Sequence, residues 1–181
     1  MSEKSNTGLV VGFILFIGVS IAAGNNIASQ WSTGIEIHNH WDQPIDYAIK
    51  SSPNEALVKF QEVKKWMEDK RLTEGDTCAF GWQQSPYCDL HIWYADRIEN
   101  TISDLQGIQT SKPSDSALVM QQIKTRHEYS TDKGGWEVTQ PPNLNQWLRY
   151  RSANVWLGLW DLLSYVVIML AFLVAFTLIF T

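Results

Sequence analysis

The chain has 181 residues, enough for one domain of ordinary size beside two membrane segments. Its formal net charge is −5, and acidic and basic residues are interspersed through the middle of the sequence. A mildly acidic, mixed surface of this kind argues against nucleic-acid binding. The two ends of the chain are apolar and nearly uncharged.

The N-terminal apolar run extends from Gly8 to Ala23 and contains no charged residue. With its flanking residues it reaches about the lower length limit for a transmembrane helix. A cleaved signal peptide is the alternative, because Lys4 supplies a basic start and Ser20 and Ala22 satisfy a small-x-small cleavage rule. The run is slightly long for the core of a signal peptide, which favours a retained span.

The C-terminal run, Leu162 to Phe180, is longer and is interrupted only by Ser164 and Thr177. As a helix it measures roughly 28 Å, close to the hydrocarbon thickness of a bilayer. Asp161 marks its water-side boundary, and a short amphipathic helix from Asn145 is expected to lie at the membrane surface before it. Aromatic rings favour the headgroup layer, which predicts four membrane-interface residues: Trp147, Trp156, Trp160 and Tyr165.

Small residues four apart allow two membrane helices to approach closely. The first span has such a pair in Gly8 and Gly12, and the second has one in Ala171 and Ala175. Because the spans run antiparallel, the two pairs fall at roughly the same depth in the bilayer. These four residues are therefore the predicted contact between the spans, or between a span and a partner.

Two spans place both termini on one side of the membrane and the central domain on the other. Lys4 before the first span favours a cytoplasmic N-terminus, although Arg149 and Arg151 point the other way. Cys78 and Cys88 suit a disulfide, which implies an oxidising compartment; two reduced thiols are the alternative. We therefore expect a bacterial inner-membrane protein with both termini cytoplasmic and the central domain periplasmic.

The central domain is predicted to be mainly α-helical, with an antiparallel hairpin that the disulfide closes at its tip. Ser52 to Glu55 forms a capping box with Pro53 at the first helical position, and apolar residues then recur at helical spacing. The hairpin helices are expected at Pro53–Leu72 and Pro86–Leu105, and a third helix at Asp115–Tyr129. The resulting division is 1–27 for the N-terminal tail and span, 28–144 for the domain, and 145–181 for the interfacial segment and second span.

Before the hairpin, apolar and polar residues alternate as in a short strand. One face of that strand would carry a carboxylate and two imidazoles, a set that binds zinc or another divalent cation. A polar, membrane-proximal face is the alternative, since none of the spaced metal motifs is present. The candidate metal ligands are Glu36, His38 and His40.

No phosphate loop, nucleophile elbow or paired-cysteine zinc motif occurs in the sequence, and no cofactor is expected. The resulting hypothesis is a non-enzymatic, membrane-anchored interaction or accessory subunit of an envelope assembly. Its expected partners are the lipid bilayer and either another membrane protein or further copies of the chain. Two alternatives remain open: a periplasmic sensor or ligand-binding module that signals through a partner, and a metal-binding envelope protein that uses His38 and His40.

Overall fold

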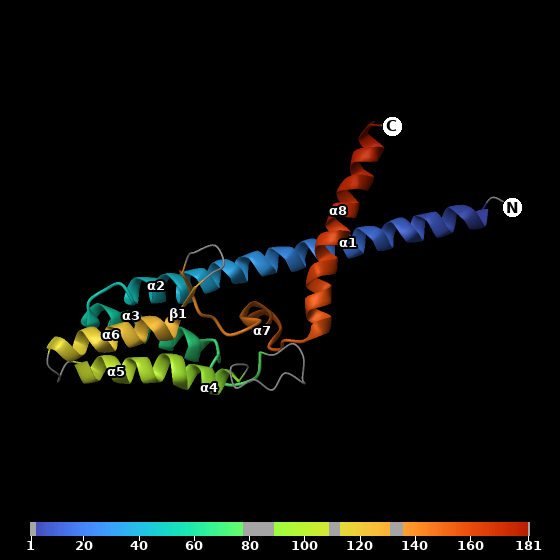
Figure 1. Cartoon of the computed structure of the whole chain (residues 1–181). Helices are drawn as coiled ribbons and strands as arrows, with labels where there is room; N and C mark the ends of the chain where they lie inside the picture. The colour runs from blue at the N-terminus through green and yellow to red at the C-terminus, as the bar shows by residue number, and fades with distance from the viewer. Residues whose placement is uncertain (1–2, 78–88, 109–112, 131–135, 181) are drawn as a thin grey trace. The chain divides into compact units, whose positions relative to one another are not determined.

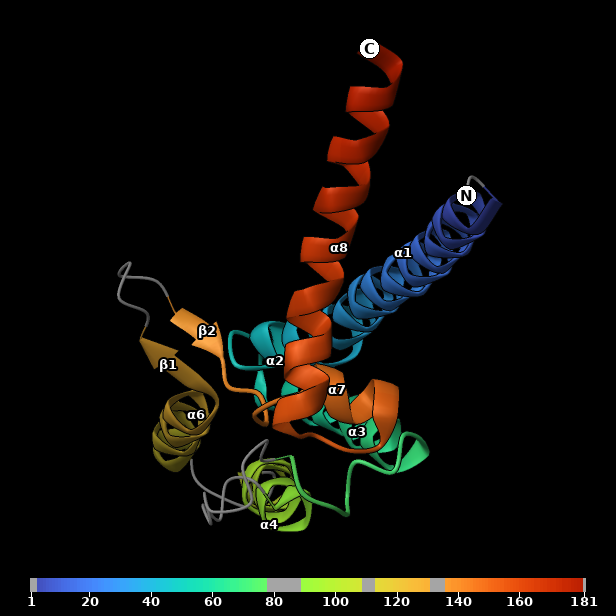
Figure 2. The same cartoon turned by 90° about the vertical axis from the view of Figure 1, so that its right-hand side faces the viewer.

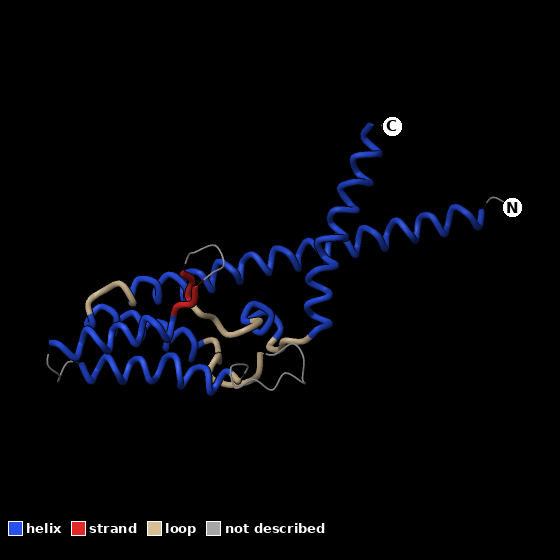
Figure 3. Tube along the Cα trace, in the orientation of Figure 1, coloured by secondary structure: helices blue, strands red, loops and turns tan. Residues whose placement is uncertain are grey.

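The computed structural model describes residues 3–77, 89–108, 113–130 and 136–180, and these are mainly helical (Figures 1 and 3). The chain divides into two compact units, which are described separately. One unit comprises residues 1–32 and 155–181, and the other comprises residues 33–154. The predicted disulfide between Cys78 and Cys88 lies outside the described residues.

The first unit contains most of α1 (Glu3–Ile37) and all of α8 (Val155–Phe180). Both helices are long and apolar enough to cross a membrane, as the sequence predicted. Most of their large apolar side chains are exposed, among them Phe13, Ile14, Leu162 and Phe172. Such faces need either lipid or another protein to cover them.

The second unit begins in the last turn of α1 and continues as a π-helix, η1 (His38–Asp42), and α2 (Gln43–Ala48). Helix α3 (Pro53–Asp69) follows, and then one unbroken helical stretch made of α4 (Leu90–Tyr94), a second π-helix, η3 (Ala95–Glu99), and α5 (Asn100–Ile108). After α6 (Pro113–His127) come two antiparallel strands, β1 (Glu128–Ser130) and β2 (Trp136–Val138), which lie side by side in Figure 2. Helix α7 (Leu144–Tyr150) completes the unit.

The strand predicted before the hairpin is wrong, because this stretch is helical. The apolar residues that decide its conformation are Ile37, Trp41 and Ile45, all of which are buried. They recur every four residues and extend the helical period of α1 directly into the domain core. That burial outweighs the short alternation on which the strand prediction depended.

Helix α3 begins as predicted. The Glu55 carboxylate accepts hydrogen bonds from the Ser52 backbone N–H at 3.3 Å and from the Ser52 hydroxyl at 3.0 Å, and Pro53 occupies the first turn. The helix ends at Asp69, earlier than expected, and Arg71 adopts a left-handed conformation just beyond it. Gly75 also has a positive φ, and a Cβ there would lie 3.0 Å from the Trp147 ring, so only glycine fits.

The α4–η3–α5 stretch runs antiparallel to α3. The Tyr94 hydroxyl donates to Glu68 at 3.1 Å, and Lys64 pairs with Glu99 at 3.5 Å. A later residue of the stretch therefore contacts an earlier residue of α3, as in an antiparallel pair. The described part of the stretch begins at Leu90, where extended Asp89 forms the N-cap, and the predicted start at Pro86 lies outside the described residues. The Asp89 carboxylate accepts from the backbone N–H of His91 at 2.9 Å.

One hydrophobic core joins all the helices of the second unit. Helix α3 contributes a stripe of residues at helical spacing, and the opposing stretch contributes apolar residues to the same cluster: Ala56, Phe60, Val63, Trp66, Met67, Leu90, Tyr94, Ile98 and Ile102. Trp147 also belongs to this core and is 6% exposed. Its assignment to the membrane interface is therefore corrected: the ring fills the space above Gly75 instead of facing lipid.

Phe60 is fully buried and packs against the His127 ring with centroids 4.8 Å apart. We expect Phe60→Ala to lower the free energy of unfolding by about 3–5 kcal/mol, because it removes a buried ring and leaves a cavity. Denaturant unfolding of the full chain in detergent measures the effect. The matched control is Val58→Ala, an exposed position on the same helix that should change stability little. A wild-type midpoint for Phe60→Ala would contradict the core assignment.

Candidate functional site

Two π-helices lie in the described part of the second unit, and both shift the backbone hydrogen-bond register by one residue. The Gln43 N–H donates to the carbonyl of His38, and the Asn100 N–H donates to that of Ala95, in each case five residues earlier. π-Helical turns are rare and are frequent at functional sites. The segments η1 and η3 are therefore the first places to search for a site.

A cavity of about 320 Å³ adjoins η1. Its described lining combines side chains from η1 and α2 with residues of β2 and the segment after it: His38, Asp42, Gln43, Asp46, Val138 and Gln140. The lining holds two carboxylates, one imidazole and two amides, and none of these residues is a lysine or arginine. We call this cavity the η1 pocket.

The walls of the η1 pocket are held together across almost one hundred residues of sequence. The Gln140 side-chain amide donates to the Asp42 carboxylate, and the Trp41 indole N–H donates to the Thr139 carbonyl at 3.1 Å. His38 Nδ1 lies 3.9 Å from Asp42 Oδ2, and Asp46 pairs with Lys50 one turn further along. A pocket of this size and mixed polarity suits a small polar ligand that carries a positive charge.

The three predicted metal ligands do not share a face. In a helix, residues two apart point in different directions, so His38 lines the η1 pocket whereas His40 stacks on Trp66 at a centroid distance of 5.9 Å. Glu36 accepts a hydrogen bond from the Trp66 indole at 3.3 Å and pairs with Lys70. Within the described residues, no three histidine, cysteine or acidic side chains are grouped so that they could hold a metal.

Those contacts also set the protonation of Glu36. Burial alone would raise the pKa of the carboxyl group, but the hydrogen bonds from Lys70 and Trp66 outweigh it and hold the pKa below its ordinary value. Glu36 is thus an ionised structural partner that ties the end of α1 to α3.

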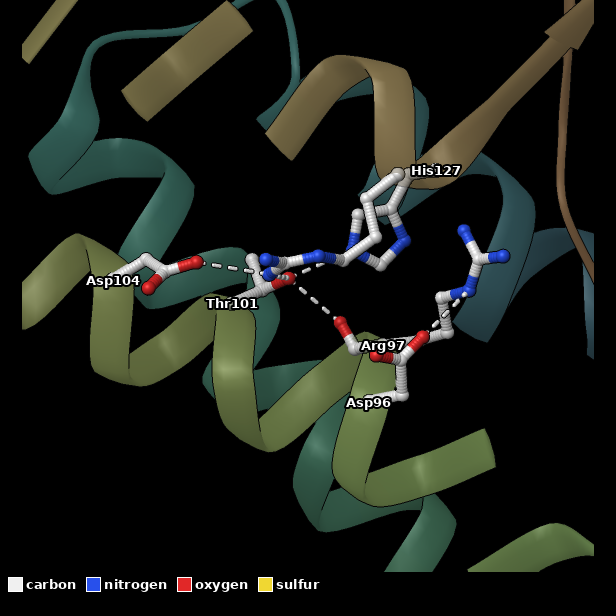
Figure 4. Close-up of polar contacts among 6 residues, drawn as sticks. Asp96, Arg97, Thr101, Asp104 and His127 are labelled. Carbon is white, nitrogen blue, oxygen red and sulfur yellow. Dashed lines mark hydrogen bonds and ion pairs between the residues drawn. The ribbon is translucent and has the colours of Figure 1, made fainter. Parts of the chain in front are cut away.

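A second polar cluster, shown in Figure 4, lies between α6 and the η3–α5 stretch. His127 and Thr101 are fully buried, and His127 Nε2 lies 2.9 Å from the Thr101 hydroxyl oxygen. That hydroxyl donates to the Arg97 carbonyl at 2.7 Å and accepts from Arg126, whose guanidinium also pairs with Asp104 at 2.9 Å. Because the threonine proton is used on the carbonyl, the histidine N–H on Nε2 must be the donor between these two residues.

The surroundings of His127 keep its imidazole neutral. Burial lowers its pKa to about 3, and the nearby guanidinium groups of Arg97 and Arg126 act in the same direction. The ring is enclosed by protein, and it packs on Phe60. The buried imidazole therefore joins α6 to α5.

In the first unit, the packing predicted for Gly8, Gly12, Ala171 and Ala175 stays a prediction, and the structure bears only on Gly12 and Ala175. A Cβ built on Gly12 meets no atom within 4 Å, so α8 does not contact α1 there. Ala175 instead lines an apolar hollow of about 600 Å³ on α8, together with Met169, Phe172, Leu173 and Phe176. The two helices meet nearer the domain: a Cβ at Gly24 would lie 3.9 Å from the Ile168 side chain, and Asn26 of α1 donates hydrogen bonds to Asp161 and Ser164 of α8.

The remaining predicted interface aromatics lie at the start of α8. Trp156 and Tyr165 are exposed, and Trp160 is half-buried. The Tyr165 hydroxyl donates to the Gln30 side chain at 3.4 Å. The headgroup contact predicted for these rings stays a prediction.

Comparison with protein-family models, with curated proteins and with solved structures found no match for this chain.

Sequence reasoning missed most of the residues that form these sites. Asp46, Gln140 and His127 belong to no spaced motif, because their neighbours come from distant parts of the chain. Asn26 and Ser164 did carry a signal: each is a polar residue next to or within an apolar run. In a membrane helix such residues usually find a hydrogen-bonding partner, which here lies on the other helix.

His127 makes stability depend on pH. Between about pH 6.5 and 3, the unfolded chain binds a proton at this position and the folded chain does not. We therefore expect the free energy of unfolding to fall as pH is lowered through this range, by at most about 1.4 kcal/mol per pH unit from this residue.

Denaturant unfolding of the full chain in detergent at a series of pH values gives the slope. His127→Gln should flatten it, whatever its effect on absolute stability, whereas His91→Gln, at an exposed position, should leave the wild-type slope. Equal slopes for wild type and His127→Gln would show that the imidazole is not buried in its neutral form.

Proposed function

We propose that this chain is a membrane-anchored, non-enzymatic accessory subunit of a membrane assembly, with residues 33–154 as its interaction domain. The observation that carries the proposal is the apolar surface of α1 and α8, which the protein itself leaves largely uncovered. A bilayer accounts for most of that surface. The apolar hollow beside Ala175 suits the packing of a further helix, because a small residue lets another helix approach closely.

The polar groups of the domain support a binding role over catalysis. His127 is enclosed by its neighbours, and Glu36 is committed to Lys70 and Trp66. The proposal includes an inner-membrane location with the domain on the periplasmic side, as the charge distribution around the first span favours. The Cys78–Cys88 disulfide remains part of this proposal.

The test is purification of the native protein in mild detergent, followed by mass spectrometry of the proteins that travel with it. We expect a stoichiometric membrane-protein partner or a defined homo-oligomer. Ala175→Leu, which fills the hollow on α8, should weaken that association because it prevents close approach of the partner helix. Val166→Leu, an exposed position elsewhere on α8, is the matched control. A monomeric protein with no partner would contradict the proposal.

A ligand-binding module is the second candidate, and the η1 pocket favours it. The pocket lies at the lower end of the size range of small-molecule sites, and its carboxylates suit a cationic group. The probe is agmatine, titrated calorimetrically into the full chain in nanodiscs. We expect saturable binding that weakens about tenfold or more in Asp42→Asn, since a charge-assisted contact contributes about 1.5–3 kcal/mol.

Glu62→Gln is the matched control, because Glu62 is a carboxylate on α3 that is absent from the described lining of the pocket. It should bind agmatine as the wild type does. If Asp42→Asn and Glu62→Gln behave alike, the η1 pocket is not the binding site.

A further inference from the structure

A buried polar contact between helices α1 and α8 fixes their register. The Asn26 side-chain amide donates to Asp161 Oδ1 at 3.1 Å and to Ser164 Oγ at 2.9 Å. Asn26 is only 7% exposed and Ser164 is fully buried. We call Asn26, Asp161 and Ser164 the interhelix lock.

The lock joins the end of one apolar run to the start of the other. The apolar run of α1 ends at Ala23, three residues before Asn26, and that of α8 begins at Leu162, directly after Asp161. A carboxylate is costly within hydrocarbon, so Asp161 limits how far α8 can enter it. Because Asn26 is hydrogen-bonded to Asp161, the depth to which α1 can enter the hydrocarbon is limited at the same level.

Two exposed tryptophans lie at equal distances beyond the lock. Trp31 follows Asn26 by five residues, and Trp156 precedes Asp161 by five. Five helical residues span roughly 7.5 Å, and the headgroup region on each side of a bilayer is roughly 5–7 Å thick. Trp31 is 69% exposed and Trp156 is 76% exposed, so neither ring is needed to pack the protein.

Tyr165 completes the pattern from the apolar side. It lies one turn beyond Asp161, inside the apolar run of α8, and its hydroxyl reaches back to Gln30, next to Trp31. An amphipathic side chain near the edge of hydrocarbon directs its polar tip toward the headgroups in this way.

We propose that the lock marks the domain-side edge of the hydrocarbon, and that Trp31 and Trp156 bind the lipid headgroup layer just outside it. The inference rests on the proposed membrane anchoring and adds to it the depth of both helices and the residues that contact headgroups. It assigns lipid to Trp31, a residue that no sequence pattern had singled out. Contact of these rings with a protein partner or with water is the competing outcome.

The experiment uses the full chain labelled with 5-fluorotryptophan in phosphatidylcholine nanodiscs. Single Trp→Phe variants assign the ¹⁹F resonances. A gadolinium chelate is then supplied either on a lipid headgroup or as a water-soluble complex. We expect the lipid-anchored chelate to broaden the Trp31 and Trp156 lines most, and to affect least Trp41 and Trp93, which are buried in the domain core.

Each outcome is decisive. If only the soluble chelate broadens Trp31 and Trp156, both rings lie in water and the inference is overturned. If neither chelate broadens them, the rings lie away from both headgroups and water, covered by protein or deep in the hydrocarbon, and the inference is also overturned. Flotation with liposomes tests the anchoring separately: a chain that does not float overturns both proposals, and one that floats with unbroadened rings overturns only this one.

Asn26→Leu tests the lock, with exposed Asn25→Leu as the matched control. Removing the Asn26 amide frees α1 to shift in depth relative to α8, so the ratio of Trp31 to Trp156 broadening should move away from its wild-type value. Asn25→Leu should preserve that ratio. An unchanged ratio in Asn26→Leu would show that the lock does not set the depth of the helices.

Discussion

The burial of Trp41 is the interaction on which the domain depends. Its ring is fully enclosed, with its centroid 5.0 Å from that of Trp93 and 6.4 Å from that of Trp66, so it connects η1 to both helices of the antiparallel pair. Its indole N–H is satisfied by the Thr139 carbonyl, which ties the segment after β2 to the same point. A buried indole needs such a partner, and here that requirement also closes the wall of the η1 pocket.

The π-helical register follows from this arrangement. In η1 the hydrogen bond spans five residues instead of four, and along this segment Trp41 is buried while His38 and Asp42 line the pocket. In η3 the carbonyl of Arg97 accepts from the buried Thr101 hydroxyl, and the Arg97 guanidinium lies over the Trp93 ring. The two π-helices therefore flank one aromatic centre, with η1 supplying Trp41 and η3 following Trp93.

Local features of the fold were predictable because their causes are local. The cap at Ser52 and Glu55 and the apolar stripe of α3 depend on residues within one helix, and the two spans depend on composition alone. The strand prediction failed because it depended on a short alternation of apolar and polar residues. The buried residues from Ile37 to Ile45 recur every four positions, which is the helical period.

The candidate sites were not predictable in the same way. Gln140 meets Asp42 across ninety-eight positions, and His127 meets Thr101 across twenty-six. Neither pair has a spacing that a motif could capture, since tertiary packing alone brings it together. The same holds for Trp147, which was read as interfacial from its neighbours but is held in the core by the space that Gly75 leaves open.

The contact between α1 and α8 shows why hydrogen-bonded polar residues can fix the register of two helices, which a pair of small residues cannot do. Small residues permit close approach at several depths, because one turn of slip presents a similar surface. The Asn26 amide donates to both Asp161 and Ser164.

The Ser164 hydroxyl donates its proton to the Trp160 carbonyl at 2.8 Å, so its oxygen remains an acceptor for Asn26. A slip of one turn would break both bonds, and an average interhelical hydrogen bond in a membrane contributes only about 0.6 kcal/mol. The lock therefore contributes little to stability. Its effect is to select one register between α1 and α8, the one in which their apolar runs end at about the same level.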